Sequence, residues 1–181
     1  MTNEAWFGVT PEPIALKIAE HISMSTPDDR DVIIDTFAGA GANAIAFAQS
    51  GRWQKVIAIE KDPQVLQCAK HNAALYGVGD DIEWIEGDCF EVLLTIPAET
   101  RSRSAVFASP PWGGQSYRSE EVFDLSSMQP YSVKQLYDAL SKVSQNLVLY
   151  LPRSSDLEQL AEFVEDGKQA LCIYFGDMVN Y

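Results

Sequence analysis

The chain has 181 residues, of which 46% are hydrophobic, and this length suits one well-buried domain over residues 1–181 rather than two. Its 13 basic and 26 acidic residues give a formal net charge of −13, which argues against a broad basic surface for long nucleic acid. Two histidines, three cysteines without metal-ligand spacing and no apolar stretch of membrane-spanning length lead us to expect a soluble protein without a metal.

Helical and strand-like patterns alternate along the sequence. Residues 10–13, Thr-Pro-Glu-Pro, are typical of an N-cap and a first helical turn, and the apolar spacing after them predicts an amphipathic helix. Short apolar runs predict strands over 31–37, 55–60, 82–86, 104–109 and 147–151. Helical patterns occupy 42–49, 63–76, 90–96, 133–143 and 156–163. Such alternation predicts an α/β fold with a doubly wound, mostly parallel sheet of six to seven strands and helices on both faces.

The C-terminal part of the sequence predicts one further strand, over 170–175. It follows Asp166-Gly167, a dipeptide that favours a tight turn. We therefore expect the last strand to run antiparallel to its neighbour at one edge of the sheet.

Acidic residues stand at the ends of the first three predicted strands. Asp35 lies near the end of the first, Glu60 ends the second and Asp88 follows the third. At such positions a carboxylate can accept both hydroxyls of a ribose, as expected of Glu60, or an adenine amino group, as expected of Asp88. Together the three acids predict an adenosine-binding cleft, whereas each acid alone can be a solvated helix cap.

A glycine-containing loop joins the first strand to the next helix. Its glycines, Gly39 and Gly41, allow a ligand to approach the backbone closely, and Gly39-x-Gly41-x-x-Ala44 fits the dinucleotide fingerprint as well. Asp35 would repel a pyrophosphate at this helix start but attract an ammonium group, which favours S-adenosylmethionine (SAM) over NAD.

The segment Ser109-Pro110-Pro111-Trp112 emerges where the fourth predicted strand ends. The prolines stiffen the backbone and leave the carbonyls of Ser109 and Pro110 free to accept from a ligand amino group. Trp112 offers an exposed, flat aromatic ring beside them. Taken alone, the segment can also be a stiff loop whose tryptophan packs inward.

In this order the motifs resemble those of class I, Rossmann-like SAM-dependent methyltransferases that act on exocyclic amino groups. A longer set, running from Trp6 to Asp177, resembles the trimethylguanosine synthase family of RNA cap methyltransferases. That set comprises Trp6-Phe7-Gly8-Val9-Thr10-Pro11-Glu12, Ser109-Pro110-Pro111-Trp112-Gly113-Gly114, Phe123-Asp124, Leu151-Pro152-Arg153 and Tyr174-Phe175-Gly176-Asp177. The resemblance implies two successive methyl transfers from SAM to N2 of a 7-methylguanosine cap, giving the 2,2,7-trimethyl form and S-adenosylhomocysteine (SAH).

The resemblance also assigns roles to individual residues. The residues that it places against the cofactor are Asp35, Phe37, Gly39, Gly41, Asn43, Glu60, Asp88 and Ser109. Those that it places against the capped substrate are Trp112, Asn72, Tyr117, Arg153 and Thr10, with Ser109, Pro110 and Trp112 as the catalytic group. Tyr117 and Arg153 would approach the cap phosphates, although Arg153 can instead cap a strand end. Methylation at N7 makes guanine cationic, and tryptophan is the best aromatic partner for a cation.

Two other functions stay open from the sequence. One is methylation of guanine N2 or adenine N6 within RNA or DNA, and the other is a SAM-binding or cap-binding module without turnover. For the leading function the resemblance implies small nuclear and nucleolar RNA as substrate and recruitment by ribonucleoprotein components. It further implies a monomer in the nucleus and nucleolus, with the cytoplasm as a second location.

Overall fold

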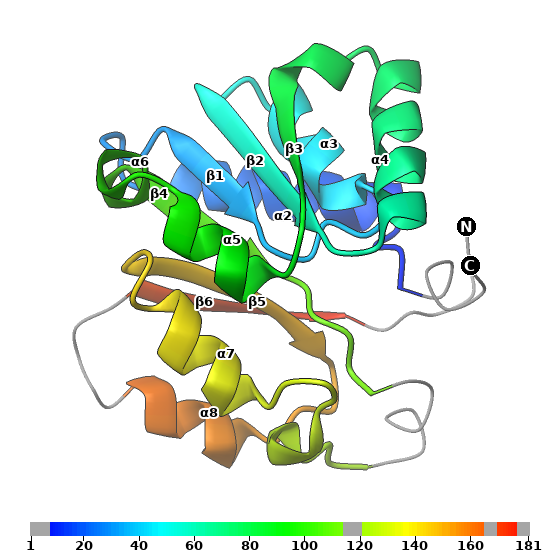
Figure 1. Ribbon diagram of the computed structural model, residues 1–181. Coiled ribbons are helices and arrows are strands. Elements are labelled where there is room, and N and C mark those ends of the chain that lie inside the picture. The colour runs from blue at the N-terminus through cyan, green and yellow to red at the C-terminus, as the bar shows by residue number, and fades with distance from the viewer. Residues whose placement is uncertain (1–7, 114–120, 165–169, 177–181) are drawn as a thin grey trace.

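The computed structural model describes residues 8–113, 121–164 and 170–176. Six parallel strands form one sheet in the order β3-β2-β1-β4-β5-β6 (Figure 1). The strands are β1 (Val32–Asp35), β2 (Lys55–Glu60), β3 (Ile82–Glu86), β4 (Ser104–Ala108), β5 (Asn146–Pro152) and β6 (Ala170–Gly176). The described helices are α2 (Glu12–Ser25), α3 (Ala42–Gln49), α4 (Pro63–Leu75), α5 (Cys89–Thr95), α6 (Ala98–Ser102), α7 (Val133–Leu140) and α8 (Leu157–Val164).

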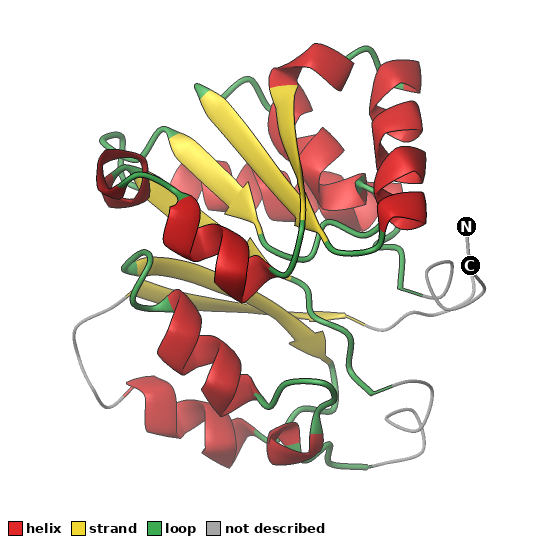
Figure 2. Cartoon of the chain, viewed as in Figure 1, coloured by secondary structure: helices red, strands yellow, loops and turns green. Residues whose placement is uncertain are grey.

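Helices cover both faces of the sheet, as predicted. Figure 1 shows α2, α3 and α4 on one face and α5, α7 and α8 on the other. The red helices and yellow strands of Figure 2 show the same three layers. Because both faces are covered, every residue of the central strands β1 and β4 is buried, which explains the apolar runs 32–34 and 105–108 within them.

The edge strand β6 corrects one prediction. It pairs with β5 in parallel, from Asn146 opposite Ala170 to Pro152 opposite Gly176, so the expected antiparallel edge is wrong. The reason is the connection, in which α8 carries the chain from the end of β5 back to the start of β6. A crossover of a dozen or more residues that contains a helix produces a parallel pair, whereas a tight hairpin turn produces an antiparallel one.

Side chains cap the N-termini of several helices, but Thr10 does not cap α2. Asp62 caps α4 by accepting from the backbone N–H groups of Gln64 and Val65, at 2.8 and 3.2 Å. At α2, by contrast, the N-cap position is Pro11 and no side chain caps the helix. The prediction that Thr10 is the N-cap is therefore wrong, and its hydroxyl instead accepts a hydrogen bond from Asn43.

The strand order locates the ligand site. From β1 the chain continues to β2 and β3 on one side, and β4 and β5 lie on the other side. Ligands of such sheets bind outside the carboxyl ends of the strands at this reversal of direction. The crevice is thus expected between the loops that follow β1 and β4. Among the described helices, none has the length and apolar character required to cross a membrane.

Candidate active site

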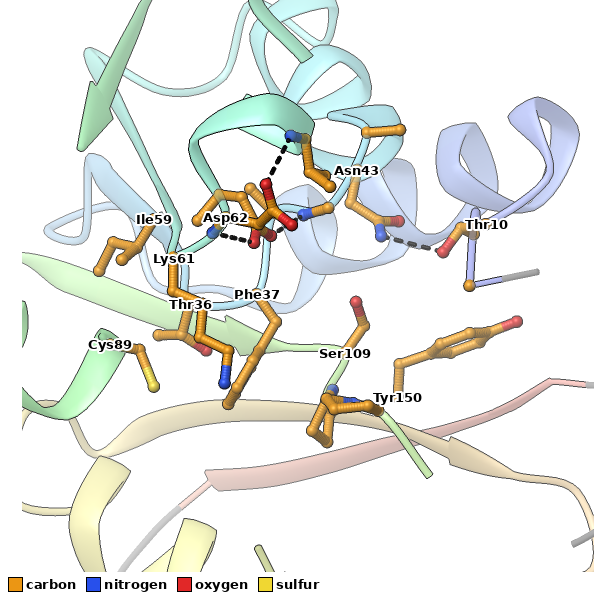
Figure 3. Close-up of a pocket in the computed structure, with 18 of the residues that line it drawn as sticks. Thr10, Thr36, Phe37, Asn43, Ile59, Lys61, Asp62, Cys89, Ser109 and Tyr150 are labelled. Carbon is orange, nitrogen blue, oxygen red and sulfur yellow. Dashed lines mark hydrogen bonds between the residues drawn. The ribbon is translucent and has the colours of Figure 1, made fainter. Parts of the chain in front are cut away.

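A cavity of about 320 Å³ opens at the carboxyl ends of the strands (Figure 3). Its size lies within the range of small-molecule sites, about 300 to 1,000 Å³. Residues after β1, β2, β3 and β4 contribute to its wall, together with Tyr150 of β5 and residues of the segment before α2. The predicted residues among them are Thr10, Phe37, Gly39, Asn43, Glu60, Asp88, Ser109, Pro110 and Trp112.

The loop after β1 has a conformation that requires glycine. Gly39 and Gly41 have φ values of +53° and +92°, which side-chain-bearing residues rarely adopt. A Cβ on Gly41 would lie 3.1 Å from the ring of Trp84 and 3.2 Å from Cβ of Ala69. Gly39 has nothing within 4 Å of its Cβ position. The loop is therefore packed tightly against β3 and α4 at Gly41 but open at Gly39.

Glu60 connects this loop to the end of β2. One carboxylate oxygen accepts from the backbone N–H of Gly39 at 2.9 Å, and the other accepts from the N–H of Asp62 at 2.9 Å. Each carboxylate oxygen can accept more than one hydrogen bond, so Glu60 keeps acceptor capacity toward the cavity that it lines.

Asp35 is completely buried at the end of β1. One carboxylate oxygen accepts from the N–H of Phe37 at 3.3 Å, and the other oxygen has no partner among the described residues. Burial raises the pKa of Asp35 to about 7; the bond from Phe37 opposes this rise, and the charge of Glu60 adds to it. Asp35 is not itself among the residues that line the cavity, although Thr36 and Phe37 are.

Asp88 lies between a helix start and an aromatic cluster. One oxygen caps α5 by accepting from the N–H of Phe90 at 3.0 Å, and the other accepts from the hydroxyl of Tyr131 at 2.9 Å. The Tyr131 ring meets Phe90 edge-on, with centroids 4.8 Å apart, and lies 6.4 Å from the Phe37 ring. This end of the cavity therefore combines a fixed acceptor with flat apolar walls.

Thr10 and Asn43 form a buried polar pair on the other side of the glycine loop. The Asn43 amide donates to the Thr10 hydroxyl at 3.0 Å, as the dashed line in Figure 3 shows. The Asn43 carbonyl oxygen is buried and has no partner among the described residues. The pair therefore presents an unused acceptor beside the cavity.

In the segment after β4, the aromatic ring of Trp112 does not have the exposure that was predicted. Ser109 points into the cavity in Figure 3, and Pro110 is buried in the wall. Trp112 is only 6% exposed, because its ring packs against Tyr150 at 5.7 Å and its N–H donates to the Tyr150 carbonyl at 3.2 Å. The expectation of an exposed ring is wrong, but Trp112 and Tyr150 both line the cavity.

Two predicted substrate residues, Asn72 and Arg153, do not line this cavity, and a third cannot be placed. Asn72 donates to the carbonyl of Ala40 at 2.9 Å and lines a separate cavity of about 250 Å³ behind the loop. Arg153 lines a surface groove beside α8. Tyr117 lies outside the described residues.

Sequence reasoning also missed cavity residues. Tyr150 is hidden within the apolar pattern of β5, and only its place at a strand end could have indicated it. Tyr131 and Lys61 line the cavity as well, from a loop and from the end of β2, and no local pattern marks them. No group of three or more metal-ligating side chains occurs in the described part of the chain.

The polar groups of the cavity fit a nucleoside that carries a cation. Glu60 and Asp88 are acceptors at neighbouring strand ends, and Asp35, which does not line the cavity but precedes the lining residues Thr36 and Phe37, has a buried oxygen that lacks a donor among the described residues. Gly39 lines the cavity with nothing near its Cβ position, so the loop presents backbone rather than a side chain there, whereas the predicted cofactor residue Gly41 is not among the lining residues. The carboxylates of Glu60 and Asp88 can accept from hydroxyl and amino groups of a ligand. An electrophilic group of the same ligand can lie between β1 and β4, where the strand order reverses.

Comparison with known proteins agrees with this geometry. Residues 30–174 match the family model described as RNA cap guanine-N2 methyltransferase. The chain is 34% identical to trimethylguanosine synthase of Schizosaccharomyces pombe, with 95% of this chain and 76% of that protein covered. It is 35% identical to trimethylguanosine synthase of Saccharomyces cerevisiae, with 89% of this chain but only 50% of that protein covered.

A solved structure shares the fold. It is a Staphylococcus aureus protein assigned as a caffeoyl-CoA O-methyltransferase, with a TM-score of 0.51, 19% identity and coverage of 75% of this chain and 54% of that one. At this identity the likeness concerns the fold alone.

Proposed function

This chain belongs to the RNA cap guanine-N2 methyltransferase family, and from that premise we propose that its cavity serves methyl transfer from SAM to N2 of a 7-methylguanosine cap. One observation carries the proposal. The acceptors after β2 and β3 and the Ser109–Trp112 segment after β4 line a single cavity at the reversal of the strand order. A cofactor site and an amine-positioning segment therefore face each other.

The cofactor fits across the carboxyl ends of β3, β2 and β1. Neighbouring strands lie about 4.8 Å apart, so the distance from β3 to β4 is about 14 Å, which is long enough for an extended nucleoside and amino acid. Asp88 would accept from the adenine amino group, Glu60 from the ribose and Asp35 from the ammonium group. SAM supplies an electrophilic sulfonium methyl group when it is bound.

The segment after β4 would hold the guanine. Trp112 would place its ring against the cationic base, an interaction worth about 2 kcal/mol when desolvated. The Ser109 hydroxyl or carbonyl and the Pro110 carbonyl would accept from the N2 amino group and hold its nitrogen toward the methyl donor. Orientation of this kind can lower a barrier by about 7–11 kcal/mol.

A strong base is not required in this scheme. The lone pair of the guanine amine is delocalised into the ring, and its proton becomes acidic only after the methyl group is transferred. Water can then take the proton. Neither histidine of the chain, His21 or His71, is among the described residues that line the cavity, in agreement with this scheme.

The biological context is part of the proposal. We propose capped small nuclear and nucleolar RNA as the substrate, two successive transfers as the outcome, and a monomer as the working form. Ribonucleoprotein components would recruit the enzyme in the nucleus and nucleolus, with a further share in the cytoplasm. The net charge of −13 favours contacts limited to the cap over extended contact with the RNA backbone.

One assay tests the activity. The protein is incubated with SAM and a 7-methylguanosine cap dinucleotide, and mass spectrometry counts the added methyl groups. We expect products with one and two additional methyl groups, and no product from a cap that lacks the N7 methyl group. Methylation of cap-free RNA instead would indicate an internal-base methyltransferase, and SAH binding without any product would indicate a binding module.

A further inference from the structure

Tyr131 meets the cavity at its β3 end, far in sequence from the motifs that carry the proposed function. It lies in the loop between the 3-10 turn at Leu125–Ser127 and α7, and it lines the cavity together with Asp88. Its hydroxyl donates to an oxygen of Asp88 at 2.9 Å. The tyrosine therefore contacts the acceptor that the proposed function assigns to the adenine amino group.

The two contacts of Asp88 fix the orientation of its carboxylate. One oxygen is held by the N–H of Phe90 at 3.0 Å, and the Tyr131 hydroxyl holds the other. Removing the hydroxyl would leave the second oxygen free to rotate about the helix cap or to bind water. Each oxygen can still accept another hydrogen bond, so the fixed carboxylate remains available to a ligand.

Ring packing fixes Tyr131 in turn. Its ring meets Phe90 at an interplanar angle of 89° with centroids 4.8 Å apart, and it also lies beside the Phe37 ring. Burial and the bond to Asp88 raise the pKa of Tyr131, so the phenol stays protonated and acts as the donor. Burial likewise raises the pKa of the neighbouring Cys89 thiol to about 12, so this thiol adds no negative charge to this end of the cavity.

We propose that Tyr131 is a positioning residue that fixes Asp88 as an acceptor and thereby makes the cofactor site prefer a 6-aminopurine over a 6-oxopurine. This inference rests on the proposed function. A 6-amino group donates to the held carboxylate, whereas a 6-oxo group presents a second acceptor and is repelled. Sites built around a fixed hydrogen bond discriminate strongly against ligands that lack the matching group.

Calorimetry with two ligands tests the proposal. SAH is compared with S-inosylhomocysteine, in which hypoxanthine replaces adenine, and the ratio of their dissociation constants is the readout. We expect wild type to prefer SAH about 100-fold and Tyr131→Phe to reduce that preference about tenfold. A purely structural role would weaken both ligands equally and leave the ratio unchanged, which would overturn the inference.

Two further variants complete the experiment. Tyr137→Phe makes the same chemical change on α7, at a residue that does not line the described cavity, and should keep the wild-type ratio. Asp88→Asn should lower the ratio, and adding Tyr131→Phe to it should lower the ratio no further, because the two residues act through one contact. Absence of SAH binding by wild type would contradict the proposed function itself, whereas intact SAH binding with an unchanged ratio in Tyr131→Phe contradicts this inference alone.

Discussion

The two halves of the site differ in how their side chains are held. In the β1–β3 half, Asp35, Glu60 and Asp88 each accept from the backbone N–H two residues further along the chain, at 3.3, 2.9 and 3.0 Å. In the β4–β5 half, the Trp112 indole is held by the Tyr150 carbonyl, 38 residues away. A local turn holds each acid of the first half, with Gly39 and Tyr131 as additional donors to Glu60 and Asp88, whereas strand pairing between β4 and β5 builds the second half.

This difference has consequences for mutation. A side chain that accepts from its own turn keeps that contact when the β4–β5 half changes. A ring held by another strand depends on the packing of that strand. We therefore expect variants in one half to leave the function of the other half largely intact.

The largest expected effect comes from Trp112→Ala, which removes the ring from the β4–β5 half. Transfer to the cap should fall by about 1,000-fold or more, because the base loses both its stacking partner and its alignment. The SAH affinity of the folded protein should change less than about twofold, since the β1–β3 half is held separately. Cap methylation assays and calorimetry measure the two quantities.

A second variant at this position distinguishes loss of function from loss of folding. Truncating a buried aromatic residue costs about 3–5 kcal/mol of stability, so Trp112→Phe, which keeps an aromatic ring, serves as the control. A parallel loss of SAH affinity and cap methylation in both variants would show that the halves are not independent.

The next largest effect is expected for Asp35→Asn in the β1–β3 half, and it is a change in the free energy of unfolding. Burial raises the pKa of Asp35 from 3.8 to about 7, so the folded protein binds a proton that the unfolded chain has lost between these pH values. Wild-type stability should therefore fall as pH rises from about 4 to 7. The variant should be more stable than wild type at pH 8, by up to about 4 kcal/mol, and this advantage should vanish near pH 4.

Urea denaturation across this pH range measures the difference, and calorimetry of SAH binding provides the functional counterpart. The variant should bind SAH more weakly, because the ligand ammonium loses the unpartnered carboxylate oxygen. A stability difference that does not vary with pH would contradict the assignment of the buried charge.

A smaller effect is expected from the glycine loop, where Gly41→Ala is compared with Gly39→Ala. Both residues have positive φ, but only the Gly41 Cβ would meet Trp84 and Ala69, at 3.1 and 3.2 Å. We expect a loss of about 2–3 kcal/mol of stability for Gly41→Ala and about 1 kcal/mol for Gly39→Ala. Urea denaturation tests this order, and equal losses would mean that φ alone matters.

The smallest of these effects is the weakening of SAH binding by Glu60→Ala. The change removes the ribose acceptor and also frees the N–H of Gly39 that positions the loop, and we expect about a tenfold higher dissociation constant. Glu86→Ala is the matched control, because Glu86 pairs with Glu60 across the sheet but is exposed and does not line the described cavity. An affinity that is unchanged in Glu60→Ala would remove Glu60 from the ribose site.

Much of the fold could be predicted because its signals are local. The predicted bounds 55–60, 82–86 and 42–49 coincide with β2, β3 and α3. The acids of the β1–β3 half were recognisable for the same reason, since each follows or ends a strand and forms its own turn. The direction of β6 did not follow from the Asp166-Gly167 pair, because the helix predicted over 156–163 separates the two strands and a crossover that contains a helix joins parallel strands.

The sequence by itself determined the alternation of strands and helices, the glycine loop and the positions of three acids, because periodicity and turn chemistry act over a few residues. Only the tertiary structure decided that Trp112 packs against Tyr150, that Tyr131 reaches Asp88 and that Asn72 faces a different cavity. These contacts join residues between 32 and 43 positions apart. Their formation depends on which strands and helices come together, and no pattern within a single segment records that.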